Sequence, residues 1–412
     1  MHVLFVTHCT GLAGANRSML QLIEELHSDY NVDPYVLYPK DSGSELFRKT
    51  LDSKCIPGKD ADIIFYKQSV ITASKRLEHL KSLNNQNELF NFLISGNFDL
   101  VYSNSSVIDI GVDISNRLGI PHIYHIREFG ELDYSLKCLF GNLYERLLYC
   151  TSSACISVSK AIEQYYSTKI PHKKSHLIYN GICFKEGTVL SKHNADVFQF
   201  VCAGIICNSK NQMEILYAAN ELINNRKETR FHVSFVGRGD AEYVEKMVKY
   251  IKDKNIGAHV SFLGEKDGIS GVLKDMDAGI VPSNNEAFGR VTVEYMLQNL
   301  AVIANDSGAN SEIVVDEKTG LIYESGDVIG LSNRMQILIN DRDKLISLSS
   351  EGNKRAKSMF LSMYNTKSVY ELFKSLKKSV VYSEGCYLLL KSYRFYWYIR
   401  SLCTLKIKSF RK

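Results

Sequence analysis

The sequence predicts an α/β protein of two Rossmann-like, doubly wound domains that face a central cleft. Three observations support this prediction. The chain has 412 residues, which is too long for one typical hydrophobic core. Short apolar runs alternate with helical patterns, as in parallel sheets covered by helices. A polar stretch around Ser191–Asp196 interrupts this alternation once, and the alternation then resumes.

The first half begins with an apolar run and a helical pattern, and the two then recur. The patterns predict helices over 15–28, 44–53 and 70–94, and strands over 2–7, 34–39, 100–103, 123–126 and 154–159. The second half repeats this alternation with strands over 198–204, 232–237, 260–264, 278–283 and 300–305.

Gly, Ser or Asn residues fall directly after these strands, where open α/β sheets place their ligand-binding loops. We therefore expect the site in the cleft between the halves. The predicted domains are 1–190, 196–362 and a C-terminal segment 363–412, which forms a helix crossing back onto the first domain and a basic, aromatic tail. The hinge is expected near residues 185–197.

The charge distribution argues against a nucleic-acid-binding enzyme. The net charge of +5 is concentrated in residues 384–412, where seven Lys and Arg residues accompany Glu384 as the single acidic residue. The rest of the chain is close to neutral, without the basic face that nucleic acid requires. The ten cysteines are scattered without a CxxC pair, and the first residues lack a basic leader. We expect reduced thiols, no zinc site and a cytoplasmic location.

The strongest motif is EAFGRVTVE, from Glu286 to Glu294. It follows a predicted strand and opens a helix, whose free N–H groups and dipole favour a bound anion such as a diphosphate. Glu286 could accept hydrogen bonds from sugar hydroxyls, and Glu294 from a ribose. A capped helix with an acidic first turn would explain the same spacing.

Two further loops support the same interpretation. AGIICNSKNQ places Lys210 at an expected helix start, where a cation could face a pyrophosphate. GLAGANRSML follows the first strand, and Gly11 and Gly14 would let a ligand approach the backbone closely. A surface lysine and a tight turn remain the alternatives.

Together these motifs resemble the retaining glycosyltransferases of the GT-B fold, the "group 1" and family 4 type that includes bacterial polysaccharide-building enzymes. The resemblance extends from Met1 to about Leu376. It is clearest in the order AGIICNSKNQ, VGRGD, VSFLG, EAFGRVTVEYM, NDSGANSEIV and KTGLIY.

The resemblance implies a role for each matching residue. Glu286 would contact the donor sugar and Glu294 the nucleotide ribose, and Gly14 and Ala15 would close on the phosphates. His125, in YHIREFG, would lie near the anomeric carbon, with His122 and His8 as weaker candidates and a structural histidine as the alternative. The diphosphate would be bound by Lys210 and by the segment Ala287, Phe288, Gly289 and Arg290. The Asn180–Gly181 pair would end the first half as in relatives, although a turn explains it equally well.

One position departs from the family pattern. Relatives usually have an arginine after the glycine of the lysine loop, whereas this chain has Ile205. Arg290 or Arg238 would have to substitute, or Lys210 and the helix amides would carry the leaving-group charge alone.

We predict no required metal and no cofactor. Asp-x-Asp, the metal-binding pattern of the other large glycosyltransferase fold, occurs at Asp60/Asp62, Asp275/Asp277 and Asp341/Asp343. None follows a convincing ligand-binding strand, and Lys210 with helix amides could neutralise a diphosphate.

The C-terminal segment YLLLKSYRFYWYIRSLCTLKIKSFRK mixes apolar, aromatic and basic side chains. It suits contact with an anionic membrane surface, and equally a helix packed against the first domain. Contact with lipid would place the protein at the inner face of the cell membrane.

The expected reaction moves a sugar from a nucleotide diphosphate donor to a hydroxyl of a glycan or lipid-linked saccharide, with retention and without a covalent intermediate on Glu286. In the resembling family the leaving diphosphate helps to deprotonate the acceptor. The alternatives are a nucleotide-sugar epimerase of the same architecture and a noncatalytic nucleotide-sugar-binding component of a polysaccharide-assembly complex. A Rossmann dehydrogenase is disfavoured because no GxGxxG follows a strand.

Overall fold

The computed structural model describes residues 1–12, 14–184, 197–266, 268–377 and 384–410. The chain forms two compact units, one of Met1–Gly181 with Ser362–Lys412 and the other of Ile182–Leu361. The units therefore divide before the boundary predicted at residue 190. Most of the expected hinge lies in residues 185–196, outside the described part of the chain.

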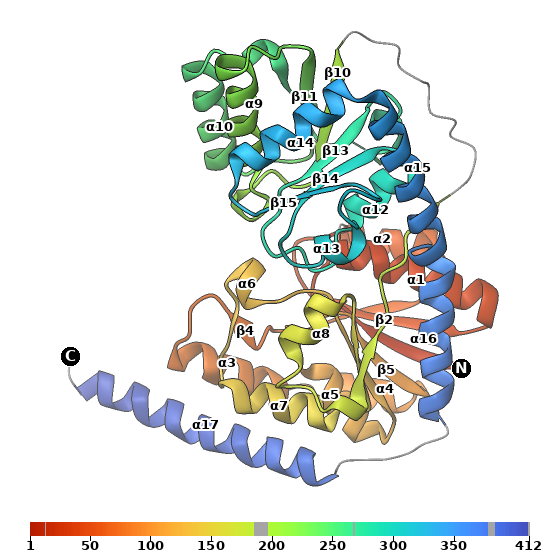
Figure 1. Cartoon of the computed structure of the whole chain (residues 1–412). Helices are drawn as coiled ribbons and strands as arrows, with labels where there is room; N and C mark the ends of the chain where they lie inside the picture. The colour runs from red at the N-terminus through yellow and green to blue at the C-terminus, as the bar shows by residue number, and fades with distance from the viewer. Residues whose placement is uncertain (13, 185–196, 267, 378–383, 411–412) are drawn as a thin grey trace. The chain divides into compact units, whose positions relative to one another are not determined.

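The first unit is built on a seven-stranded parallel sheet in the order β3-β2-β1-β5-β6-β8-β9. Helices cover both faces of this sheet (Figure 1). The strands are β1 (His2–Val6), β2 (Asp33–Pro39), β3 (Gly58–Ala61), β5 (Leu100–Ser103), β6 (His122–Ile126), β8 (Ala154–Ser157) and β9 (Ser175–Leu177), with a separate antiparallel pair β4 (Lys67–Gln68) and β7 (Lys137–Cys138).

Most helices of this unit follow a strand in the chain, and the longer ones bury an apolar side. They are α1 (Gly14–Tyr30), α2 (Ser44–Ser53), α3 (Ala73–Asn84), α4 (Asn87–Ile94), α5 (Ile110–Leu118), α6 (Glu131–Tyr134), α7 (Asn142–Thr151), α8 (Lys160–Tyr166), the 3-10 turn η1 (His172–Lys174), α16 (Ser362–Lys377) and α17 (Glu384–Phe410). The central strands are buried on both sides, because their apolar runs are covered by helices on each face.

Helix α16 returns to the first unit although it follows the second unit in the sequence. Val369 and Phe373 enter the core formed by β1 and α1, and the rings of Tyr370 and Tyr30 lie 4.3 Å apart. The Thr366 hydroxyl donates to Glu25 at 2.6 Å. These contacts attach the C-terminal segment to the first unit.

The second unit has a six-stranded parallel sheet in the order β12-β11-β10-β13-β14-β15, again between helices (Figure 1). Its strands are β10 (Phe198–Ala203), β11 (Phe231–Val236), β12 (Val260–Phe262), β13 (Ala278–Val281), β14 (Ala301–Asn305) and β15 (Leu321–Tyr323). Its helical segments are η2 (Asn208–Lys210), α9 (Gln212–Asn220), η3 (Glu221–Asn225), α10 (Ala241–Asp253), η4 (Gly257–His259), α11 (Ser270–Leu273), α12 (Arg290–Leu297), α13 (Asn310–Ile313), α14 (Val328–Asn340) and α15 (Arg342–Met359).

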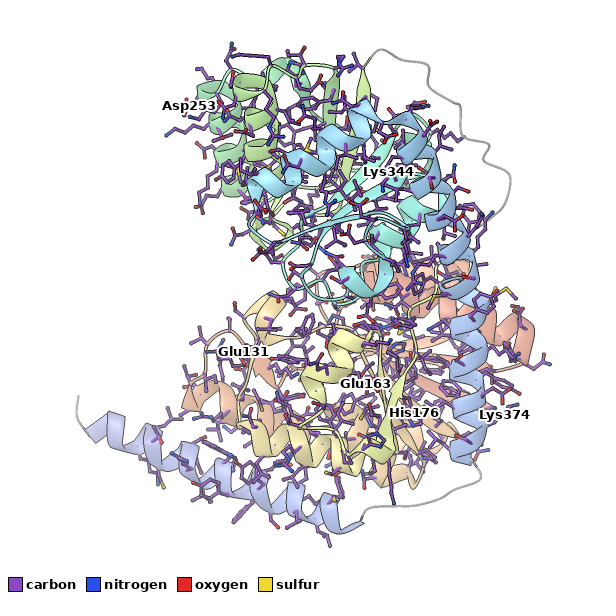
Figure 2. All side chains as sticks on the ribbon, in the orientation of Figure 1. Glu131, Glu163, His176, Asp253, Lys344 and Lys374 are labelled. Carbon is purple, nitrogen blue, oxygen red and sulfur yellow. The ribbon has the colours of Figure 1, made fainter. Side chains whose placement is uncertain are left out.

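Two parallel sheets, each between helices, confirm the predicted fold class. Some charged groups lie at the periphery of each unit, such as Glu131 on α6 and Asp253 on α10, which are both exposed (Figure 2). Among the described residues, no helix is both long and apolar enough to cross a bilayer.

Two local predictions were wrong. The stretch 70–94 forms two helices, because α3 ends at Asn84 and the buried Gln86 donates to the Asp62 carbonyl at 2.8 Å. Consecutive amide side chains compete for backbone hydrogen bonds and favour such a break. Lys210 does not start an α-helix, because it ends the 3-10 turn η2 and Asn211, with φ of 53°, precedes α9.

Candidate functional site

In the second unit, the predicted donor residues meet where the strand order of the sheet reverses. Lys210 follows β10 and Glu286 follows β13, and these strands are neighbours at the centre of the sheet. Open α/β sheets bind ligands outside the carboxyl ends of strands at such a position. The fold therefore brings together two residues that are far apart in the sequence.

Lys210 and Glu286 form an ion pair. Lys210 Nζ lies 2.7 Å from Glu286 Oε2, with the lysine side chain 36% exposed and the glutamate side chain 13% exposed. Burial raises the pKa of Glu286. The charge of Lys210 and hydrogen bonds from Lys210, the Ser283 hydroxyl and the Gly289 amide lower this pKa by more than burial raises it, so that it lies below its ordinary value. The carboxylate is thus held ionised.

The loop after β14 fixes the backbone of Glu286. The Ala309 amide donates to the Glu286 carbonyl at 2.7 Å, and Gly308 has φ of 64°. A Cβ on Gly308 would lie 2.3 Å from the Glu286 carbonyl oxygen and 2.5 Å from its nitrogen. Only glycine fits here. The sequence analysis considered NDSGANSEIV only as one motif in an ordered series and did not predict the packing role of Gly308. A glycine between small polar residues was the available signal.

Helix α12 begins directly after Glu286 and carries the second glutamate of the motif. Gly289 precedes the helix with φ of 83°, and no side chain caps this end. Arg290 Nη2 lies 3.6 Å from Glu294 Oε1 across one helical turn. Glu294 is therefore one turn into the helix. Phe288 is buried against the ring of Phe360.

The position that lacks the family arginine is open to solvent. The Ile205 side chain is 49% exposed. Arg238 follows the neighbouring strand β11, and its carbonyl accepts the Ile206 amide at 2.9 Å. The backbone of Arg238 thus lies beside the lysine loop. Arg290 belongs to the EAFGRVTVE motif and is the first residue of α12.

In the first unit, the glycine loop follows β1 and is shaped by a buried asparagine. Asn16 Nδ2 donates to the carbonyls of Cys9 at 2.7 Å and Gly11 at 2.8 Å. Gly14 begins α1 with φ of 51°, and a Cβ at Gly14 would have no neighbour within 4 Å. Asn104 Nδ2, from the end of β5, donates to the Ala15 carbonyl at 3.2 Å. The sequence analysis missed both asparagines; only Asn104 directly follows a strand, and that position was its available signal.

His125 lies near the carboxyl end of β6, at the same edge of this sheet, and is fully buried. Its Nδ1 faces the Tyr102 hydroxyl and, at 3.3 Å, Arg127 Nη2. A guanidinium can only donate, so Nδ1 accepts and the proton resides on Nε2. Nε2 has no hydrogen-bond partner among the described residues. Burial and, second, the charge of Arg127 place the pKa of His125 well below its ordinary value. His125 is therefore a neutral hydrogen-bond donor.

The two rival histidines differ in their surroundings. His122 bonds Ser103 through Nε2 and Ser152 through Nδ1, both at 2.9 Å. Burial lowers the pKa of His122 to about 3. Both nitrogens are satisfied, which indicates a structural residue. His8, after β1, has a buried Nδ1 without a partner in the described structure.

Arg127 and Glu128, which follow β6, are buried charges joined to the end of β5. Arg127 Nε donates to Asn104 Oδ1 at 2.7 Å, and Nη1 donates to Asn180 Oδ1. Glu128 Oε1 accepts from the Ser105 hydroxyl at 2.9 Å and from the Ser106 amide at 2.6 Å. Asn180 thus holds Arg127 beside His125 in addition to ending the first half.

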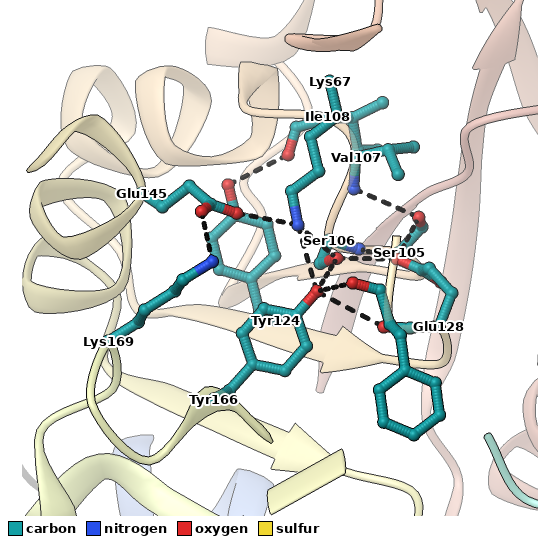
Figure 3. Close-up of polar contacts among 11 residues, drawn as sticks. Lys67, Ser105, Ser106, Val107, Ile108, Tyr124, Glu128, Glu145, Tyr166 and Lys169 are labelled. Atoms are coloured by element: carbon teal, nitrogen blue, oxygen red, sulfur yellow. Dashed lines mark hydrogen bonds and ion pairs between the residues drawn. The ribbon is translucent and has the colours of Figure 1, made fainter. Parts of the chain in front are cut away.

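A second buried network contacts the loop after β6 at the carbonyls of Glu128 and Phe129 (Figure 3). Lys67 Nζ lies 2.8 Å from Glu145 Oε1, and Lys169 Nζ lies 2.6 Å from Glu145 Oε2. Lys67 also donates to Tyr166, whose hydroxyl donates to the Phe129 carbonyl at 2.9 Å. Because both lysines pair with the Glu145 carboxylate, the network is best explained as structural support for the loop after β6.

Two of the three Asp-x-Asp segments have structural roles. The Gln199 amide donates to Asp277 at 2.9 Å, and Asp341 caps α15 through the Lys344 amide at 2.8 Å. Within the ranges that the structure describes, no group of three or more His, Cys, Asp or Glu side chains could hold a metal ion.

Family comparisons cover both halves of the chain. Residues 12–185 match the family model described as Glycosyltransferase Family 4. Residues 190–355 match the model described as Glycosyl transferases group 1.

Among known proteins, the chain is similar to an uncharacterized glycosyltransferase of Methanocaldococcus jannaschii. The two are 27% identical over 68% of this chain and 77% of the archaeal protein. A second relative is the Escherichia coli UDP-Gal:alpha-D-GlcNAc-diphosphoundecaprenol alpha-1,3-galactosyltransferase, with 24% identity over 68% of this chain and 76% of that enzyme.

Among solved structures, Anabaena Alr3699/HepE in complex with UDP superimposes with a TM-score of 0.76. It covers 91% of this chain and 100% of the Anabaena chain at 19% identity. This similarity concerns the fold.

Proposed function

Because the chain belongs to the GT-B-fold glycosyltransferases that join a family 4 domain to a group 1 domain, we propose that it transfers a sugar from a nucleotide diphosphate donor to a hydroxyl of a surface glycan. Retention of the anomeric configuration is part of the proposal. It rests on the family resemblance of the Glu286–Glu294 segment.

The observation that carries the proposal is the Lys210–Glu286 pair beside the start of α12, with 2.7 Å between Nζ and Oε2. A nucleotide sugar brings a diphosphate and sugar hydroxyls, which need a cation and an acceptor, respectively. Lys210 can turn to the diphosphate, while Glu286 accepts hydrogen bonds from the sugar. Glu294, one turn further, accepts from the ribose. The complexes of the Anabaena protein with UDP and with UDP-glucose support such a donor.

The proposed mechanism needs no protein nucleophile. The C–O bond to the diphosphate breaks while the acceptor oxygen forms a bond on the same face, and the leaving diphosphate takes the acceptor proton. Lys210 and the amides from Ala287 to Arg290 stabilise the charge that develops on the leaving group. Gly14 and Ala15 would close on the same phosphates.

His125 contributes by donating from Nε2 to a sugar oxygen. Its neutral state suits this role, because a buried imidazole flanked by Arg127 is a poor base. His125 therefore orients the sugar rather than removing a proton.

The acceptor is proposed to be a glycan or a lipid-linked saccharide. The name of the E. coli relative specifies transfer to a diphosphoundecaprenol-linked sugar, which is an acceptor of this kind. A cytoplasmic enzyme working at the membrane surface would fit such an acceptor. Metal independence and the absence of a cofactor are also part of the proposal, since Lys210 and α12 supply positive charge.

The two alternatives are not favoured by the family assignment. An epimerase would convert the donor without an acceptor, and a noncatalytic binder would hold the donor without turnover. Both would use the same donor residues, so activity has to separate them.

The test is incubation of the full-length protein with a panel of nucleotide sugars, with and without a lipid-linked saccharide. Proton NMR of the product gives the anomeric configuration, and a chelator arm tests the metal. The proposal predicts acceptor-dependent product with the donor's configuration in both arms. Donor conversion without an acceptor would support the epimerase, and donor binding without turnover would support the noncatalytic binder. An inverted product would overturn retention, and restoration of chelator-lost activity by magnesium or manganese would overturn metal independence.

A further inference from the structure

Side-chain contacts with the first unit determine which side of the C-terminal helix α17 faces inward. It lies along α3 and α7 (Figure 1). Arg394 Nη1 bonds both carboxylate oxygens of Asp113, at 2.7 and 2.8 Å, and Nε donates to the Tyr144 hydroxyl at 2.8 Å. The ring of Trp397 stacks under the Arg76 guanidinium at 4.3 Å. Leu390 and Ser401 are buried on the same side of the helix.

Because these anchors fix one side of α17, the opposite side faces outward. Its large side chains are 45–67% exposed and define the outer face: Leu388, Leu389, Phe395, Tyr396 and Ile399. At 100° per residue they occupy an arc of about 120°. An apolar arc of this width on a helix that already buries its other side is unusual for a solvated surface and indicates a binding surface.

Cations border the outer face on both edges. Lys391 lies beyond one edge, with Nζ 4.5 Å from the Tyr387 ring. Arg400 lies beyond the other edge, with its guanidinium 4.8 Å from the Trp397 ring and a 3.0 Å bond to the Tyr396 hydroxyl. Residues 385–412 contain no Asp or Glu. An apolar stripe between two cationic edges matches a helix that lies flat in the headgroup region, with its basic side chains reaching the phosphates.

We propose that the outer face of α17 binds the surface of an anionic bilayer. The anchored side of the helix would hold the first unit at the membrane. A second copy of this chain fits less well, because two such faces would bring like charges together along both edges. This proposal concerns membrane binding alone. Membrane binding can fail while the proposed glycosyl transfer holds, and glycosyl transfer can fail while membrane binding holds.

The experiment is co-sedimentation of the full-length protein with vesicles of phosphatidylcholine, with or without about 30% phosphatidylglycerol. The test variant combines Leu389→Ser, Phe395→Ser and Ile399→Ser. The charge variant combines Lys391→Gln and Arg400→Gln. The matched control combines Ile329→Ser and Ile346→Ser, which alter side chains of the second unit that are 51% and 57% exposed. Thermal unfolding verifies that each variant folds.

We expect the wild type and the control to sediment with anionic vesicles and to remain in solution with phosphatidylcholine alone. The outer-face variant should lose binding by about tenfold or more, and the charge variant by about tenfold. Binding of a folded outer-face variant at the wild-type level would overturn the inference. Failure of the wild type to bind would also overturn it, and a wild-type dimer that the outer-face variant converts to monomer would assign the face to a second copy.

Discussion

Lys210 Nζ and Glu286 Oε2 lie 2.7 Å apart, from loops that follow two neighbouring strands of the second sheet. Because Lys210 keeps the pKa of a largely buried carboxylate low, removing the lysine should let burial dominate and raise that pKa. Glu286 would then take up a proton at a higher pH.

This change predicts a pH-dependent stability difference for Lys210→Met. With its folded pKa lowered, Glu286 contributes stability that is complete above its unfolded pKa of 4.5 and is lost as the pH falls through the folded pKa. We expect Lys210→Met to lower stability by about 1 kcal/mol near pH 7, since Lys210 is partly exposed. The loss should shrink toward pH 4.

Thermal unfolding at several pH values measures this difference. Lys354→Met is the control, because it removes an exposed pair with Glu351 and should change the melting temperature little at any pH. A loss that stays constant between pH 7 and pH 4 would show that the pair does not control the ionisation of Glu286.

Gly308→Ala should damage the donor site more than backbone strain explains. The left-handed conformation alone costs about 1–2 kcal/mol for alanine. The added Cβ would also meet the Glu286 backbone at 2.3 Å. Gly326→Ala is the matched control, since Gly326 has φ of 87° and no neighbour within 4 Å of the added Cβ. Donor affinity should fall in Gly308→Ala and persist in Gly326→Ala. Equal affinity in both variants would show that the contact does not shape the site.

Arg290 is expected to compensate for Ile205. It lies on the first turn of α12, and its 3.6 Å distance to Glu294 leaves it able to turn to a diphosphate. Calorimetric titration with nucleotide sugar should show a loss of about tenfold in affinity for Arg290→Ala. Arg238→Ala is the comparison, because Arg238 lies beside the lysine loop. An unchanged affinity and turnover in Arg290→Ala, with a loss in Arg238→Ala, would transfer the role to Arg238.

His125 should stay neutral, with its proton on Nε2, between pH 5 and pH 8. Its lowered folded pKa means that its contribution to stability is complete above the unfolded value of 6.5 and is lost as the pH falls from there toward the folded pKa. Nitrogen-15 NMR, assigned with His125→Asn, reports both the tautomer and the charge. Protonation of His125 near pH 6.5 would contradict the proposed donor role.

The sequence predicted the fold class because apolar runs of four to six residues alternate with helical patterns, and β1, β10 and β13 appear where these runs lie. It also predicted that Lys210 and Glu286 follow strands. It could not predict that the two side chains form an ion pair, since strand order is a tertiary property.

Other parts of the site depend on contacts between distant segments. The support of Glu286 by Gly308 and of Arg127 by Asn180 involves no local pattern. The break at Asn85 was missed because the apolar period continues across it. The sequence of the C-terminal tail was equally compatible with packing against the first domain and with lipid contact. In the structure one side of α17 packs against the first unit, whereas lipid contact through its exposed outer face is a proposal.

The most direct test of the central claim is release of nucleoside diphosphate from the preferred donor by wild type, Glu286→Ala and Glu324→Ala. Glu324 is an exposed glutamate of the same unit. Loss of a group that positions the donor sugar should lower the release rate about 100-fold or more in Glu286→Ala, while Glu324→Ala stays within about twofold of wild type. Release by Glu286→Ala at the wild-type rate would contradict the assignment of the donor site.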